Sequence, residues 1–216
     1  METIILLHGF ASSGGSTKAR FLREELEVFP QVEFHPFEFS PTPKDFEFMS
    51  VTGMIGRLRQ YLLDHPREEV TLIGSSMGAL VGLHYAHRFG GVGRMLLLAP
   101  ALIHPAASIS EGEFRAREYD GFFLTPHFAF KKEVPLRYAY FFDGLFYVKP
   151  PPPPAPILII HGLSDETVSI EHSRHYADRY DQAKLIEVDS GHQLNDQLPA
   201  VWEKVQSFLL GSVQVD

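Results

Sequence analysis

The chain has 216 residues, 44% of them hydrophobic and 21% charged, and its formal net charge is −8. The composition is that of a soluble globular protein, and the length fits one domain over residues 1–216. The negative charge argues against a nucleic-acid partner, since phosphate binding needs a basic surface. The absence of cysteine excludes disulfides and a thiolate nucleophile. Because no apolar run reaches the ~20 residues of a membrane-spanning helix and no signal peptide fits before Thr3, we expect a cytoplasmic location.

Six apolar runs have the length and composition of strands. In chain order they are Thr3–Leu7, Val32–Phe37, Val70–Ile73, Met95–Ala99, Ile157–Ile160 and Leu185–Val188. Most are nearly all aliphatic, which is typical of strands covered by helices on both faces. Helical patterns lie between them, at Ala19–Leu26, at Met54–Leu62 and at Val201–Leu209, with Pro199 near the start of the last helix. The alternation predicts an α/β fold with a doubly wound, mostly parallel six-stranded sheet.

Residues 101–153 interrupt this alternation and are too long for a simple connection. The segment is dense in aromatic residues, namely Phe114, Tyr119, Phe122, Phe123, Phe128, Phe130, Tyr138, Tyr140, Phe141, Phe142, Phe146 and Tyr147. We expect most of these rings to pack the segment onto the body and a minority to line an apolar pocket. The proline run at residues 150–154 is interpreted as a rigid strut into the next strand, in preference to a docking site for a proline-recognising module.

The most informative motif is Gly74-Ser75-Ser76-Met77-Gly78, which lies between an apolar run and a helical pattern. A G-x-S-x-G sequence in this position predicts a tight strand-to-helix turn that presents the central serine, Ser76, as a nucleophile. Ser75 would be the alternative only if the motif were misread.

A serine hydroxyl needs a base, and the base needs an orienting carboxylate. Asp165 follows the fifth strand-like run and His192 follows the sixth, so both are expected at the carboxyl edge of the sheet together with Ser76. The order serine, acid, histidine along the chain is also the one that accompanies a G-x-S-x-G turn in an α/β fold. Asp143, Asp189 and Asp196 are rival acids, of which Asp189 is expected to support the histidine loop instead.

Four stretches together resemble the α/β-hydrolase superfamily, in particular its compact bacterial serine esterases and thioesterases (YqiA-like). They are Leu6–Phe10, the turn at Gly74–Gly78, Ile160–Gly162 with Asp165, and Gly191-His192. The resemblance spans residues 3–210. It implies a sheet order of second, first, third, fourth, fifth and sixth strand, without the two leading antiparallel strands of larger relatives. It also implies that the insertion at about 101–153 is a small lid over the active site.

The resemblance implies a serine carboxylesterase that cleaves short- to medium-chain acyl esters through Ser76, His192 and Asp165. The backbone N–H groups of Phe10 and Met77 would stabilise the oxyanion. His8 and His161 are interpreted as structural histidines. No cofactor or metal is expected, although His84 with His87 and His172 with His175 have the spacing of metal ligands.

Two other functions remain open at this point. One is an acyl-CoA thioesterase, for which Lys131, Lys132 and Arg137 are candidate phosphate contacts. The other is a small-ligand receptor that retains the triad but turns over little. The natural substrate, the chain length of the acyl group and the choice between monomer and homodimer are not fixed by the sequence.

Overall fold

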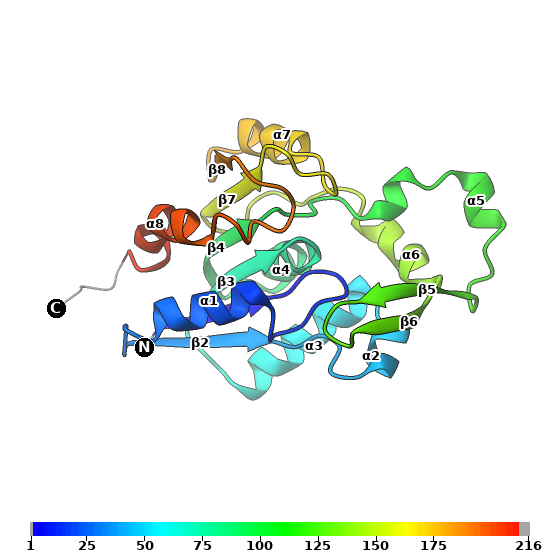
Figure 1. Ribbon diagram of the computed structural model, residues 1–216, viewed down its shortest axis with the longest axis horizontal. Helices are drawn as coiled ribbons and strands as arrows, with labels where there is room; N and C mark the ends of the chain where they lie inside the picture. Colours follow the sequence, from blue (N-terminus) through cyan, green and yellow to red (C-terminus); the bar gives the residue numbers. More distant parts are fainter. Residues whose placement is uncertain (1, 212–216) are drawn as a thin grey trace.

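The computed structural model describes residues 2–211 (Figure 1). Its main sheet contains β1 (Glu2–Leu7), β2 (Val32–Phe37), β3 (Val70–Ser75), β4 (Val92–Leu98), β7 (Ile157–Gly162) and β8 (Ala183–Val188). The strand order is β2-β1-β3-β4-β7-β8, and each neighbouring pair is parallel. The fold class and the strand order expected from the sequence are therefore confirmed.

Helices cover both faces of this sheet, as the aliphatic strands predict. Helices α1 (Thr17–Leu26) and α8 (Leu198–Leu209) pack on one face, where Leu22 and Trp202 join Ile4 and Leu6 in one apolar cluster. Helices α3 (Val51–Asp64), α4 (Met77–Phe89) and α7 (Glu171–Arg179) cover the other face. Successive residues of β1 alternate between the two clusters, which is the period-two pattern of a strand.

The helix starts follow from local sequence. The hydroxyl oxygen of Ser16 accepts a hydrogen bond from the N–H of Ala19 at the start of α1, and Ser50 caps α3 in the same way. Helix α2 (Pro43–Glu47) is an element that the sequence pattern did not predict. It is only five residues long, and it is stabilised at its start by a capping box between Thr42 and Asp45.

The insertion, residues 101–153, forms a small layer of its own. It contains two 3-10 turns, η1 (Pro105–Ser108) and η2 (Leu145–Tyr147), and two short helices, α5 (Glu111–Arg115) and α6 (Ala139–Gly144). Strands β5 (Phe122–His127) and β6 (Lys132–Arg137) pair as an antiparallel hairpin. In Figure 1 the insertion lies beyond the carboxyl ends of the sheet strands, toward which the arrowheads point.

Polar contacts attach the insertion to the body at several points. Asp143 accepts hydrogen bonds from the backbone N–H (3.0 Å) and the hydroxyl of Thr52, and that hydroxyl also lies 2.7 Å from the hydroxyl of Tyr147. Arg137 pairs with Glu47 at 2.6 Å. The proline run is held as well, because the carbonyl of Pro151 accepts a hydrogen bond of 2.9 Å from Tyr176 in α7.

The aromatic residues of the insertion fall into three groups by burial. Tyr140 and Tyr147 are buried in the main core cluster. Six rings are half-buried, namely Phe114, Phe123, Phe130, Tyr138, Phe141 and Phe142, and among these Phe123, Phe130 and Phe141 pack against that cluster. Others are mainly exposed, namely Tyr119, Phe122, Phe128 and Phe146.

Within residues 2–211 none of the helices has the length and apolar character needed to cross a bilayer.

Candidate active site

Ser76 occupies the turn between β3 and α4 in a conformation that non-glycine residues rarely adopt. Its φ and ψ are 51° and −116°, and such strain is characteristic of functional positions. The turn is possible because of the two glycines beside it. A Cβ on Gly78 would lie 2.1 Å from the carbonyl oxygen of Leu7, and one on Gly74 would lie 2.5 Å from the Cα of Ala79.

The structure brings the three predicted catalytic side chains together. Nε2 of His192 lies 3.1 Å from Oγ of Ser76. Nδ1 of the same imidazole lies 2.8 Å from Oδ2 of Asp165. Each residue follows a different strand, β3, β7 or β8, and their meeting results from the shared carboxyl edge of the parallel sheet.

The surroundings of Asp165 keep its carboxyl group ionised. Burial raises the pKa of Asp165, but hydrogen bonds from the N–H groups of Val168 (2.8 Å) and Thr167 (2.9 Å) and from His192 outweigh it and hold that pKa below its ordinary value. A carboxylate can only accept, so Nδ1 of His192 carries the proton and Nε2 is free to accept one from Ser76. This is the tautomer that a general base requires.

His161 is a second partner of the acid that sequence reasoning did not assign. Its Nε2 lies 3.0 Å from Oδ2 of Asp165 and 3.1 Å from the carbonyl oxygen of Val168, and its Nδ1 lies 2.8 Å from the hydroxyl of Ser173. Burial lowers the pKa of His161 despite these acceptors, so the ring is neutral and donates from Nε2. The placement of His161 at the end of β7, four residues before the acid, was the available signal.

The rival residues have other contacts. The carboxylate of Asp143 is hydrogen-bonded to Thr52, and that of Asp196 accepts a hydrogen bond of 2.5 Å from Ser190. Asp189 is exposed. Ser75 is buried as the last residue of β3, behind the turn.

The loop after β1 lies directly against the serine turn. A Cβ on Gly9 would approach the Cβ of Ser76 and the carbonyl oxygen of Ser75 to 3.4 Å each. Within residues 2–211, the N–H groups of Phe10 and Met77 donate to no protein acceptor. Both predicted oxyanion donors are therefore unengaged, and Met77 is the first residue of α4, where helix N–H groups are free and the dipole favours negative charge.

Polar contacts hold that loop in place. His8 lies within 2.9 Å of the carbonyl oxygen of Gly9 and within 2.9 Å of Oε1 of Glu38. The other carboxylate oxygen of Glu38 accepts a hydrogen bond of 3.0 Å from the N–H of Gly14. Burial raises the pKa of Glu38, but hydrogen bonds from His8, Gly14 and Ser40 outweigh it and leave that pKa below its ordinary value. His8 thus joins the loop to the residues that follow β2, and its hydrogen bonds are with Gly9, Glu38 and the N–H of Phe39.

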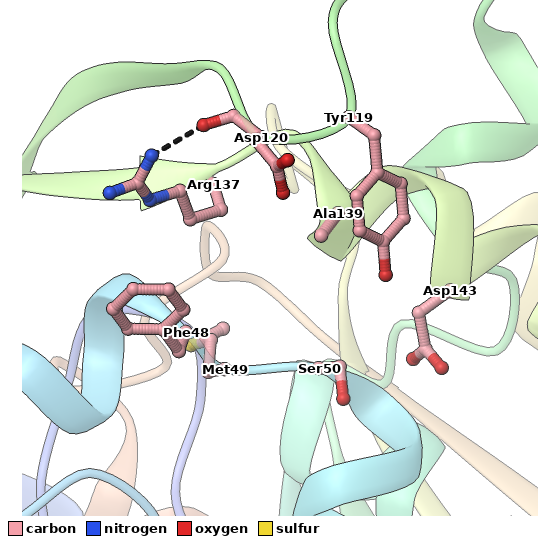
Figure 2. Close-up of a pocket in the computed structure, with 8 residues that line it drawn as sticks. All are labelled: Phe48, Met49, Ser50, Tyr119, Asp120, Arg137, Ala139 and Asp143. Carbon is pink, nitrogen blue, oxygen red and sulfur yellow. Dashed lines mark hydrogen bonds between the residues drawn. The ribbon is translucent and has the colours of Figure 1, made fainter.

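A separate cavity of about 470 Å³ lies between the insertion and the body (Figure 2). Figure 2 shows Phe48 and Met49 of the body facing Tyr119 and Arg137 of the insertion. None of the three predicted catalytic residues lines it. The guanidinium of Arg137 is already bound to Glu47 and to the backbone carbonyl of Asp120, which leaves it poorly placed to bind a coenzyme A phosphate.

The histidine pairs with metal-ligand spacing do not converge on a site. His84 is buried against the ring of Tyr147 at a centroid distance of 4.8 Å, whereas His87 and the pair His172 and His175 are exposed. Among the residues from 2 to 211, no three histidine, aspartate or glutamate side chains are grouped to hold a metal ion.

The model of the Uncharacterised protein family (UPF0227) matches residues 3–209. The chain belongs to this family. No curated protein matches it. Among solved structures, it is similar to alpha/beta hydrolase domain-containing protein 10 from mouse, with 20% identity, a TM-score of 0.78 and coverage of 96% of this chain and 89% of that one. It is also similar to Est1E from Butyrivibrio proteoclasticus with ferulic acid bound, with 20% identity, a TM-score of 0.73 and coverage of 99% and 90%. The α/β-hydrolase fold is thereby confirmed.

Proposed function

We propose that the protein is a serine carboxylesterase that hydrolyses short- to medium-chain acyl esters. The observation that carries the proposal is the chain of contacts from Ser76 through His192 to Asp165, with separations of 3.1 and 2.8 Å. The α/β-hydrolase fold supports it, and one of the similar structures is an esterase with an aromatic acid bound. The insertion, residues 101–153, would serve as the lid.

The residues would act in two half-reactions. The hydroxyl of Ser76 attacks the ester carbonyl carbon while its proton passes to Nε2 of His192. The N–H groups of Phe10 and Met77 stabilise the oxyanion, which collapses as the alkoxide takes the proton from the imidazole. A water molecule then attacks the acyl-enzyme while His192 accepts its proton, and the imidazole returns that proton to the oxygen of Ser76 as the acid is released. Asp165 orients the imidazole throughout and stabilises its positive charge.

An acyl-CoA thioesterase would use the same three side chains. A thioesterase needs free basic groups near the entrance to bind the coenzyme A phosphates. Arg137, however, is bound to Glu47, and its guanidinium lies over the rings of Phe48 (5.1 Å) and Phe122 (5.4 Å). Lys131 and Lys132 are exposed at the hairpin tip. Because one of the three basic candidates is occupied, we place the oxygen ester first.

The test compares kcat/KM for p-nitrophenyl butyrate and butyryl-CoA with the same preparation. We expect the oxygen ester to be turned over at least as efficiently as the thioester, and turnover to be lost in His192→Ala. A large excess of kcat/KM for butyryl-CoA would replace the proposed substrate class. Binding of esters without turnover by the intact protein would favour a receptor.

A further inference from the structure

Tyr140, in α6 of the insertion, contacts both residues whose backbone N–H groups would form the oxyanion hole. Its side chain is deeply buried, with 4% of its surface exposed. The hydroxyl lies 3.4 Å from Sδ of Met77. The ring lies 5.8 Å from that of Phe10, centroid to centroid, which is within the range of aromatic packing. Phe10 lies in the loop after β1 and Met77 begins α4, and Tyr140 touches the side chains of both.

We propose that Tyr140 is a positioning residue, which holds the two oxyanion donors at the separation needed by the transition state. This inference rests on the proposed esterase function. An oxyanion hole works because its donors are in place before charge develops, and a shared brace fixes one donor relative to the other. Tyr140 itself touches neither Ser76 nor His192 in the hydrogen-bond pattern of the site.

Tyr140 is held firmly enough to act in this way. Its ring packs against that of His104 at 4.5 Å. A Cβ on Gly144, at the end of the same helix, would lie 2.1 Å from Nδ1 of His104, so α6 approaches His104 as closely as a glycine allows. Burial raises the pKa of Tyr140, and the hydroxyl therefore stays protonated and able to donate.

The insertion contacts the oxyanion loop at a second point. The backbone N–H of Phe128, at the hairpin tip, donates a hydrogen bond of 3.0 Å to the carbonyl oxygen of Ala11, next to Phe10. Ala11 has a φ of 51°, a conformation that needs support from outside the loop. Ala139 and Asp143 of α6 line the cavity in Figure 2, so one side of this helix is open while Tyr140 extends toward the site.

The alternative is a purely structural role, in which Tyr140 only fills the core. Tyr147 provides a matched control, because it is another buried tyrosine of the insertion whose hydroxyl contacts the body, at 2.7 Å from Thr52. Tyr140→Phe and Tyr147→Phe each remove one hydroxyl and keep the ring. A purely structural role predicts similar effects of the two changes.

The experiment measures kcat and KM of both variants for an ester and for the matching thionoester. The sulfur of a thionoester is a poor hydrogen-bond acceptor, so its hydrolysis gains little from the oxyanion hole. For Tyr140→Phe we expect kcat on the ester to fall about 3- to 10-fold with KM little changed, the order of one lost hydrogen bond. The ester-to-thionoester rate ratio should fall with it. Tyr147→Phe should leave that ratio at the wild-type value.

Tyr140→Leu removes the ring as well and should lower kcat about 10- to 100-fold. This loss is smaller than that expected when one oxyanion donor is removed completely. If that variant does not fold, Tyr140→Phe carries the test. A wild-type ratio in Tyr140→Phe, or an equal fall of the ratio in Tyr147→Phe, would overturn the positioning role. Absence of ester turnover by the wild-type protein would instead overturn the proposed function, so the two failures are distinguishable.

Discussion

The carboxyl edge of the sheet and the insertion differ in how their polar groups are satisfied. At the edge, Asp165 accepts two backbone N–H bonds and contacts two imidazoles, and both ring nitrogens of His192 have partners. Where the insertion packs on the body, three buried histidines have an Nε2 without a hydrogen-bond partner in the described part of the chain, namely His84, His104 and His127.

The contrast separates a fully hydrogen-bonded centre from an insertion whose buried imidazoles lack some partners. Strand ends in a parallel sheet are placed by the backbone, so residues there can be held in a complete hydrogen-bond network. The insertion is held by ring packing and by a few polar contacts, and its buried imidazoles add a cost when they are protonated. We therefore expect changes at the edge to affect turnover, and changes in the insertion at residues other than Tyr140 to affect mainly stability.

The largest effect on turnover is expected when the nucleophile at the carboxyl edge is removed. Ser76→Ala should lower kcat by at least about 10⁴-fold, because no other hydroxyl can form the acyl-enzyme. The measurement is p-nitrophenyl butyrate hydrolysis, with far-ultraviolet circular dichroism to verify folding. Ser75→Ala is the matched control and should keep kcat within about tenfold of wild type. Loss of turnover in Ser75→Ala alone would show that the motif had been misread.

Asp165→Asn tests the acid and should lower kcat about 10³- to 10⁴-fold with the fold retained, because an amide no longer fixes the imidazole tautomer. Asp196→Asn provides the comparison, since its carboxylate is bound to Ser190 in the same loop region. We expect that variant to remain within about tenfold of wild type. Equal losses of kcat in the two variants would mean that Asp165 is not the catalytic acid.

The buried histidines of the insertion interface predict acid sensitivity of folding. Burial lowers the pKa of His84 to about 4 and that of His104 to about 4. An unfolded histidine titrates at about 6.5, so between these values the unfolded state binds more protons and the free energy of unfolding falls as the pH falls. Each histidine should cost about 2 kcal/mol at pH 5 relative to pH 7.

Urea unfolding at the two pH values measures this loss. His104→Leu should reduce the difference in unfolding free energy between pH 7 and pH 5, because it removes one of the groups that gain a proton on unfolding. His172→Leu, at an exposed position of α7, should leave the difference unchanged. An unchanged difference in His104→Leu would mean that this ring is not held neutral in the folded protein.

The smallest effect is expected at the exposed rings of the insertion. Phe146 has 78% of its surface exposed, although it is adjacent to the fully buried Tyr147. Phe146→Ser should change the free energy of unfolding by less than about 0.5 kcal/mol, whereas Tyr147→Ala should cost about 3 to 5 kcal/mol. Thermal unfolding of the two variants provides the comparison, and a large loss in Phe146→Ser would reveal packing that the exposed ring does not show.

Much of the sheet could be predicted because most of its strands are compact aliphatic runs, with β2 (VEFHPF) as an exception. Ser76, Asp165 and His192 could be assigned to one edge because each follows such a run, and parallel strands end at the same side. The contact between Asp165 and His161 could not be predicted in this way. It depends on the direction of a side chain at the end of β7, about which hydrophobic periodicity carries no information.

The hairpin of the insertion could not be predicted from the sequence pattern. Strand β5 contains Pro126 and β6 contains Pro135, and proline within a run argues against a strand. Both are tolerated because the sheet has only two strands, which leaves open edges where a missing N–H costs little. The position of Tyr140 depends on how the whole insertion folds against the body, so its contact with Met77 could not be predicted from the sequence.

The central claim is that Ser76 is an activated nucleophile, and reaction with a fluorophosphonate tests it most directly. Intact mass and peptide mapping should show one phosphonyl group on Ser76, formed much more slowly in His192→Ala and not at all in Ser76→Ala. A wild-type protein that hydrolyses esters yet carries no label on Ser76, or that is labelled elsewhere, would contradict the account.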